Sequence, residues 1–267
     1  MARVMQVSRQ AIYRVPRRRT DPGPRPISGP VDRALVEVAR RNPTDGTRMV
    51  AALTSRALGR QVNRKRAQRV MRAQRLLKRH RRTGRRRRPG FFRVERPDQL
   101  WHMDMTSVWV AEHGWCYLNA AIDCCTREMP AWGLDVRCRA EEAIAVIEAG
   151  AARHGLEPGT LTLGTDNGTA YTSRAFRARL RDLGVVHRRG GYRDPESQAF
   201  IESFFSKLKQ RCVWRHEFET LDQAREVIAA YIERYHDRPH SGLGYRTPSE
   251  VRQTWDDAQE ALHKQAA

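Results

Sequence analysis

The sequence predicts a mixed α/β domain preceded by a small all-α module. Two observations support this prediction. Apolar residues recur at helical spacing through the first part of the chain, whereas three strand-like runs follow residue 93. Helical and strand patterns then alternate, which is typical of a sheet covered by helices. We therefore expect a five-stranded mixed sheet flanked by helices.

The positive charge of the chain is concentrated in its first third. The 267 residues carry a formal net charge of +20, and residues 1–99 contain 29 Lys and Arg against 6 Asp and Glu, a net charge of +23. The remainder therefore carries −3, which is ordinary for an enzyme domain. A segregated basic segment is typical of proteins that bind a polyanion, most simply nucleic acid.

Changes in composition divide the chain into five expected parts. These are a basic arm at 1–30, a helical DNA-binding module at 31–80, a basic tether at 81–92, a core domain at 93–215 and a C-terminal helical extension at 216–267.

The cysteines argue against a zinc-stabilised protein, and the hydropathy argues against a membrane-spanning one. The five cysteines form no Cys-x-x-Cys pair, so a structural zinc site is not expected, and their odd number favours free thiols in the cytoplasm. No apolar run approaches the roughly 20 residues of a membrane span. We expect a soluble cytoplasmic protein.

The sequence pattern of the N-terminal third predicts short helices, with basic residues around the last of them. A first helix is possible near residues 8–13, before a proline-rich linker. Three more follow. One runs from Val31 and stops at Asn42, one over 47–58 buries Val50, Leu53 and Leu58, and one runs from an Asn63 cap to Leu77. The candidate DNA contacts around the last helix are Arg60, Arg64, Lys65, Arg66 and Arg69. A solvated basic helix that enters no groove is the alternative.

The core predicts three antiparallel strands and then alternating elements. The strands are expected at 101–110, 115–123 and 127–136. A helix over 139–154, a strand ending before Asp166, a helix over 173–183 and a strand at 185–188 follow. The C-terminal part predicts a helix over 221–235 and, from the capping box Thr247–Glu250, one last short helix.

The segment from Pro195 to Arg211 is strongly amphipathic. Ile201, Phe204, Phe205, Leu208 and Cys212 share one helical face, which should be buried. Glu202 and Lys209 fall together on the neighbouring face. They lie two turns apart, too far for the usual ion pair, and this separation suggests a third party such as a metal ion or a phosphate. The alternative is a surface Glu and Lys on an ordinary helix.

Two aspartates stand at unusual places. Asp104 interrupts a strand between Trp101 and Trp109, and Asp166 directly follows the fourth expected strand. Asp166 in the run TDNGT could instead be a turn residue whose side chain bonds to its own backbone.

These residues carry a resemblance to a known family. The runs WHMDMTSV, AIDCCTREMPAWGL, GTDNGTAYTS, PESQAFIESFFSKLK and YHDRPHSGLGYRTPSEV resemble the transposases of bacterial insertion sequences made from two overlapping reading frames, as the downstream-frame product. Such proteins contain a retroviral-integrase-type catalytic core. The specific match is the 35-residue spacing between Asp166 and Glu202, with Lys209 seven residues beyond. The resemblance covers about residues 31–252.

The resemblance implies a ribonuclease-H-like fold and a DNA strand-transferase. Asp104, Asp166 and Glu202 would be the catalytic and metal-binding triad for Mg²⁺ or Mn²⁺, with two ions in the site. Lys209 would contact a phosphate. The implied partners are double-stranded DNA at element ends and target, further copies of the chain, and the upstream-frame product. A DNA-binding regulator without catalysis and a structure-specific nuclease are the alternatives.

Overall fold

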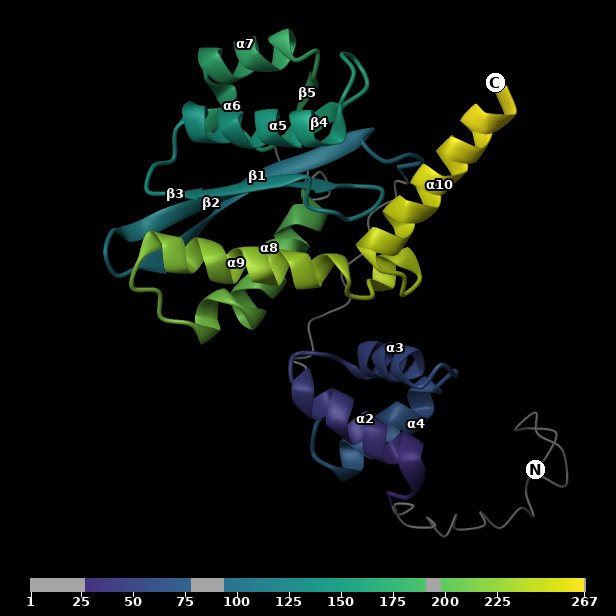
Figure 1. Ribbon diagram of the computed structural model, residues 1–267. Coiled ribbons are helices and arrows are strands. Elements are labelled where there is room, and N and C mark those ends of the chain that lie inside the picture. The colour runs from purple at the N-terminus through teal and green to yellow at the C-terminus, as the bar shows by residue number, and fades with distance from the viewer. Residues whose placement is uncertain (1–26, 78–93, 191–197, 267) are drawn as a thin grey trace, which may run out of the picture. The chain divides into compact units, whose positions relative to one another are not determined.

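The computed structural model describes residues 27–77, 94–190 and 198–266 (Figure 1). The chain divides into two compact units, residues 1–77 and 78–267, which are described separately. The helix expected near residues 8–13 and the basic tether at 81–92 lie outside the described residues. Among the described helices, none combines the length and the hydrophobicity that crossing a bilayer requires.

The described part of the N-terminal unit, residues 27–77, contains three helices around one small core. They are α2 (Gly29–Arg41), α3 (Thr47–Ala57) and α4 (Arg64–Ala73). The predicted Asn63 cap is confirmed, because its side chain accepts a hydrogen bond from the Lys65 N–H at 2.8 Å. Two expectations were wrong. Leu58 is exposed because α3 ends before it, and α4 stops at Ala73 because the backbone turns left-handed at Arg75.

The C-terminal unit is built on the predicted five-stranded mixed sheet. Its strands are β1 (Leu100–Val110), β2 (Gly114–Asp123), β3 (Ala131–Asp135), β4 (Thr162–Thr165) and β5 (Val186–Arg189), in the order β3-β2-β1-β4-β5. The first three pair antiparallel, and β4 and β5 add parallel to β1.

The third strand begins four residues later than expected. Asp123 ends β2, and its Oδ1 accepts the N–H groups of Cys125 and Thr126, each at 2.7 Å. Arg127 then adopts a φ of 66°, which closes the turn. The chain can therefore pair as β3 only from Ala131.

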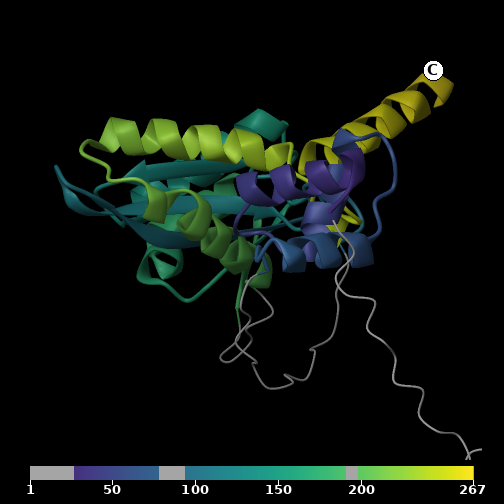
Figure 2. The same cartoon turned by 90° about the horizontal axis from the view of Figure 1, so that it is seen from below.

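Helices cover both faces of the sheet (Figures 1 and 2). One face carries α5 (Ala140–His154), the short α6 (Thr169–Thr172) and α7 (Arg174–Asp182), and the other carries α8 (Ala199–Arg211) and α9 (Leu221–His236). Side chains alternate along β1, so Trp101 and Met103 enter the core under α5 while Val108 and Val110 enter the core under α8 and α9. Asp104 shares the period of Val108 and therefore belongs to the α8 face.

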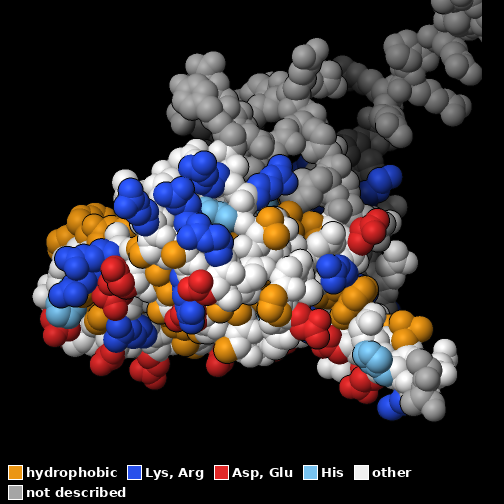
Figure 3. Space-filling model, turned by 90° about the horizontal axis from the view of Figure 1, so that it is seen from above, with side chains coloured by type: hydrophobic (Ala, Val, Ile, Leu, Met, Phe, Trp, Pro, Cys, Tyr) orange, Lys and Arg blue, Asp and Glu red, His pale blue; other side chains and the backbone are white. Residues whose placement is uncertain are grey.

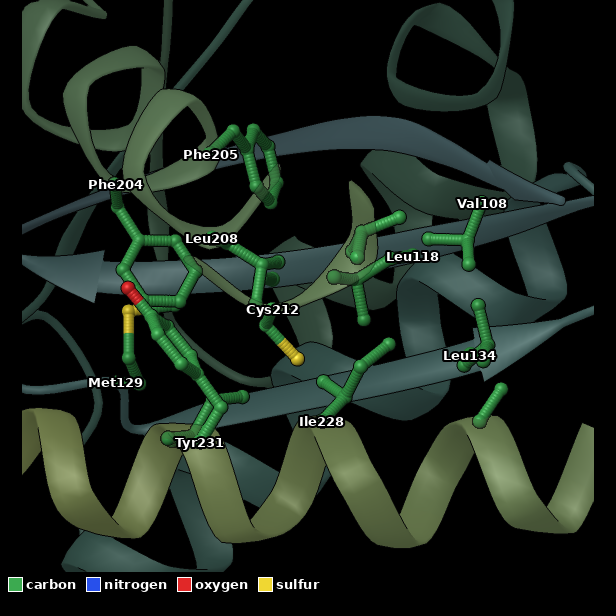
Figure 4. Close-up of a cluster of buried hydrophobic side chains, with 14 of the residues drawn as sticks. Val108, Leu118, Met129, Leu134, Phe204, Phe205, Leu208, Cys212, Ile228 and Tyr231 are labelled. Atoms are coloured by element: carbon green, nitrogen blue, oxygen red, sulfur yellow. The ribbon is translucent and has the colours of Figure 1, made fainter. Parts of the chain in front are cut away.

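The amphipathic prediction for α8 is confirmed by its packing. Phe204, Leu208 and Cys212 lie against β-strand and α9 side chains such as Leu118 and Ile228 (Figure 4). All five predicted apolar residues of this face are at most 6% exposed. The described part of the helix begins at Ala199, and residues 191–197 lie outside the described residues. A single 3₁₀ turn, η1 (Val213–Arg215), follows α8.

The C-terminal segment forms η2 (Ser241–Leu243) and α10 (Pro248–Ala266). The predicted capping box is confirmed: the Thr247 N–H donates to Glu250 Oε2 at 2.9 Å, and the Glu250 N–H donates to Thr247 Oγ1 at 3.1 Å. The expectation of a short helix was wrong, because α10 has 19 residues and neither Gly nor Pro interrupts it after Pro248. Arg252 anchors α10 through ion pairs with Asp98 and Glu128 at 2.8 and 2.6 Å.

Candidate functional site

The sheet register brings the two predicted aspartates to neighbouring positions. Trp101 of β1 pairs with Leu163 of β4, and His102 pairs with Gly164. Two residues further along each strand stand Asp104 and Asp166. Parallel strands have the same rise per residue, so the two aspartates occupy neighbouring positions at the end of β4.

Asp104 lies in an unfavourable environment for a carboxylate. It is partly buried opposite Ala120 of β2, and its Oδ1 accepts the Met105 N–H at 2.7 Å. Burial raises the pKa of Asp104, and repulsion from Asp166 and Glu202 raises it further, to about 6, against the opposing effect of that hydrogen bond. Asp104 therefore interacts electrostatically with both of the other carboxylates.

Asp166 is exposed and also makes the turn that the sequence allowed. Its Oδ1 accepts the Gly168 N–H at 2.9 Å, at the start of α6. A Cβ at Gly168 would stand 3.0 Å from this oxygen, so glycine suits the position. The turn and a role in a carboxylate cluster are compatible, since a carboxylate has two oxygens and several lone pairs.

Glu202 lies in the first turn of α8, on the exposed side next to the buried Ile201. Two turns later, Lys209 lines a groove beside Trp109 of β1. Lys207 turns elsewhere: its Nζ is 3.3 Å from His240 Nε2, in the segment after α9. The two lysines thus leave α8 in different directions, as their helical positions predict.

The donors suit a hard divalent cation, although their side chains do not form a ligand shell. Within the described ranges, no group of three or more His, Cys, Asp or Glu is arranged to hold a metal ion. Asp104, Asp166 and Glu202 offer only carboxylate oxygens, the ligands that Mg²⁺ and Mn²⁺ prefer. Their mutual repulsion, expressed in the raised pKa of Asp104, is the condition that a bound cation would relieve.

The basic residues of the N-terminal unit divide into two groups. Arg66 and Arg69 bind the buried Asp32 of α2, with nitrogen–oxygen distances of 2.6 and 2.8 Å, and so hold α2 against α4. Arg60, Arg64 and Lys65 are exposed at the start of α4 and in the loop before it. The second group is better placed to reach a phosphate backbone.

Sequence reasoning missed a basic surface on the C-terminal unit. Figure 3 shows Lys and Arg side chains gathered over the face that carries α7. The exposed arginines there are Arg174, Arg177, Arg181, Arg188 and Arg189. The helical spacing of the three on α7 could have revealed this surface, but the net charge of −3 beyond residue 99 concealed it.

The chain is similar to known proteins over most of its C-terminal unit. The integrase core domain family matches it at residues 94–195 and again at 183–248. The transposase for insertion sequence element IS904 of Lactococcus lactis is 31% identical over 161 residues, which cover 60% of this chain and 63% of that protein. The transposase InsF for insertion sequence IS3A of Escherichia coli is 29% identical over 164 residues, which cover 60% of this chain and 55% of that protein.

A solved structure shows the same fold. A chain of the simian T-cell lymphotropic virus intasome in complex with PP2A regulatory subunit B56 gamma superposes with a TM-score of 0.52 and 16% identity, over 80% of this chain and 73% of that one. The chain spans less than two thirds of the length of the curated transposases that it matches. Residues 94–248 nevertheless match integrase core domains and have the ribonuclease-H-like fold, and the chain is similar to insertion-sequence transposases with a retroviral-integrase-like core.

Proposed function

We propose that this protein cleaves DNA strands at the ends of a mobile element and joins them to target DNA, as a DDE-type polynucleotidyl transferase. The observation that carries the proposal is the convergence of three carboxylates from β1, the end of β4 and α8, close enough for two of them to raise the pKa of Asp104. A carboxylate perturbed as Asp104 is, by burial and by neighbouring carboxylates, is typical of a functional site.

In this proposal Asp104, Asp166 and Glu202 would together hold two Mg²⁺ or Mn²⁺ ions through their carboxylate oxygens. When bound, such ions neutralise the carboxylates and stabilise the attacking and leaving oxygens of a phosphodiester. The chain's own contribution is to fix three oxygen donors on rigid elements and to direct Lys209 toward a neighbouring phosphate. Water is the first nucleophile: it attacks a phosphodiester and breaks its P–O3′ bond, which releases a 3′-hydroxyl and a 5′-phosphate. That 3′-hydroxyl then attacks a phosphodiester of the second strand, whose own 3′-oxygen leaves as a hydroxyl.

The basic surfaces supply the DNA binding. Arg60, Arg64 and Lys65 of the N-terminal unit and the α7 arginines are exposed and can neutralise phosphates. We further propose that several copies of the chain act together on DNA, with the upstream-frame product of the same element as a partner.

The test uses the purified chain and a duplex that carries the element's terminal repeat. Magnesium should support both release of the 3′ end and its joining to a second duplex. Asp104→Asn, Asp166→Asn and Glu202→Gln should each lower both reactions by at least about 10³-fold while DNA binding changes less than about threefold. Glu141→Gln, which alters an exposed carboxylate of α5, is the matched control.

Other outcomes would indicate a different function or a different set of site residues. Cleavage without joining would make the chain a structure-specific nuclease. Binding with neither reaction, in the wild type and with the upstream-frame product present, would make it a regulator of transposition. Full activity in any one amide variant would remove that residue from the site.

A further inference from the structure

Three exposed tryptophans line one groove of the C-terminal unit. Trp109, Trp115 and Trp214 are 54%, 58% and 70% exposed. Trp109 and Trp115 pair across β1 and β2 with their rings edge to face, 5.3 Å between centroids, and Trp214 stands in η1. The groove measures about 540 Å³. Large aromatic side chains gathered on a hollow surface indicate a binding site, because exposing them to water is unfavourable.

The groove is the continuation of the carboxylate cluster. Both β1 and α8 run from the cluster to the groove: Asp104 and Glu202 stand at one end, and Trp109 and Lys209 at the other. Five residues of strand separate Asp104 from Trp109, roughly 16 Å, and seven residues of helix separate Glu202 from Lys209, roughly 10 Å. A chain of a few nucleotides can span that distance.

The sheet leaves this path open on one side. Among the described residues, β1 pairs with β4 only from Leu100 to His102, because β4 has four residues and β1 has eleven. The part of β1 beyond Asp104 therefore has no described strand paired with it on that edge, while α8 covers the sheet face to which Asp104 belongs. Because alternate residues of β1 point to opposite faces, Trp109 lies on the other face from Asp104, and a DNA strand whose phosphate lies at the carboxylates reaches it around this unpaired edge of β1.

The lining of the groove favours nucleic acid over another protein. Beside the tryptophans stand Lys209, Ser107 and His216, with one carboxylate, Glu217. Exposed aromatic rings with a cation and hydrogen-bonding groups are the usual means of binding unpaired nucleotides, since every base has a face that can stack. The volume also falls in the range of sites for ligands of small-molecule size.

We propose that this groove stacks the unpaired bases of the DNA strand whose phosphate lies at the carboxylate cluster. The inference rests on the proposed function for the identity of that strand, and it adds a requirement: the duplex end must open over a few nucleotides. Trp214 and Trp109 would hold the bases and Lys209 a phosphate between them.

The test measures binding of a labelled single-stranded oligodeoxynucleotide and of a blunt duplex by the full chain in chelator. Salt is raised until the basic N-terminal unit contributes little, since stacking is far less salt-dependent than phosphate contacts. Trp214→Leu should weaken single-strand binding about 5–100-fold, the loss of one stacked base, and leave duplex binding within about twofold. Trp109→Leu should do the same.

Two controls separate stacking from other effects. Trp214→Phe retains a ring and should restore most of the single-strand affinity, whereas leucine retains apolar area without a stacking face. Leu262→Ala, at an exposed apolar residue of α10, should change nothing. Circular dichroism verifies that each variant is folded.

Several results would overturn the proposal. One is an equal loss of affinity for single-stranded and duplex DNA, and another is full single-strand binding in both leucine variants. A third is that the leucine variants change only the oligomer mass in sedimentation, which would make the groove an interface between copies. Because binding is measured in chelator, a chain that stacks single strands yet never cleaves DNA would refute the proposed function and leave the groove's affinity standing.

Discussion

Asp104 combines partial burial with two like-charged neighbours, and its pKa of about 6 makes the metal-free fold sensitive to pH. The folded chain binds this proton more tightly than the unfolded chain, whose pKa is near 4. Ionisation of Asp104 therefore destabilises the fold. The stabilisation from the bound proton is present below about pH 4 and is lost as the pH rises to about 6.

Asp104→Asn should consequently be more stable than the wild type in chelator at pH 7.5. Its free energy of unfolding should be higher by about 1–2 kcal/mol once solvent screening is considered, and its melting temperature should be higher. At pH 4.5 the difference should shrink, because the wild-type side chain is then largely protonated and resembles the amide. Thermal unfolding at the two pH values measures both. A variant that is less stable than the wild type at pH 7.5 would show instead that the ionised carboxylate supports the fold.

The two lysines of α8 provide a second comparison between single residues. Lys209 lines the tryptophan groove, whereas Lys207 approaches His240. Lys209→Ala should lower strand cleavage about tenfold or more through loss of a charge-assisted phosphate contact, and Lys207→Ala should change it less than about threefold. A cleavage assay on the same duplex compares them. Equal losses would mean that the helical face does not decide the role of these lysines.

At the scale of elements, α2 and α4 are joined by one buried carboxylate. Asp32 is only 1% exposed in its side chain. Burial raises its pKa, but hydrogen bonds from Arg66, the Ser28 N–H and Arg69 outweigh that effect, and the pKa is lowered overall. The stabilisation is therefore present above about pH 4 and is lost as the pH falls further.

Asp32→Asn should destabilise the N-terminal unit by about 2–4 kcal/mol, because it leaves two guanidinium groups without their buried anion. Hydrogen exchange of the α2 and α4 amides in the full chain measures the change. Glu37→Gln is the matched control: it alters the same helix and also removes a pair with an arginine, Arg41, but both side chains are exposed. Similar exchange in the two variants would contradict a structural role for Asp32.

The elements also show what sequence could and could not predict. Periodicity identified the three N-terminal helices, the five strands and the buried face of α8, because burial on one side imposes a repeat on local residues. Asp32 escaped notice because its partners lie 34 and 37 residues away, and no local pattern records such a pair. The groove was missed for the same reason: Trp109 and Trp214 become neighbours only through the packing of α8 beside β1.

For the whole molecule, charge is the property that would govern the proposed binding of DNA. Residues 1–99 carry +23, and the α7 arginines add a second basic surface. Binding of duplex DNA should weaken steeply with salt, with a log-log slope of about −0.9 for each phosphate neutralised. Arg64→Ala with Lys65→Ala should reduce that slope by about two and weaken all sequences alike. Fluorescence anisotropy over a salt series measures it, and a flat salt dependence would show that base contacts dominate.

The sequence separation between paired strands predicts the order in which the elements of the C-terminal unit fold. Strands β1 to β3 are consecutive and pair locally, whereas β4 and then α8 return to β1 only after long intervening segments. Long-range closure costs entropy before its contacts form, so the hairpins should appear early in folding and α8 should dock late. The three carboxylates come from the early and the late parts, and they become neighbours only at the final step. During refolding from denaturant, the proposed metal-dependent activity should therefore return with the slowest phase.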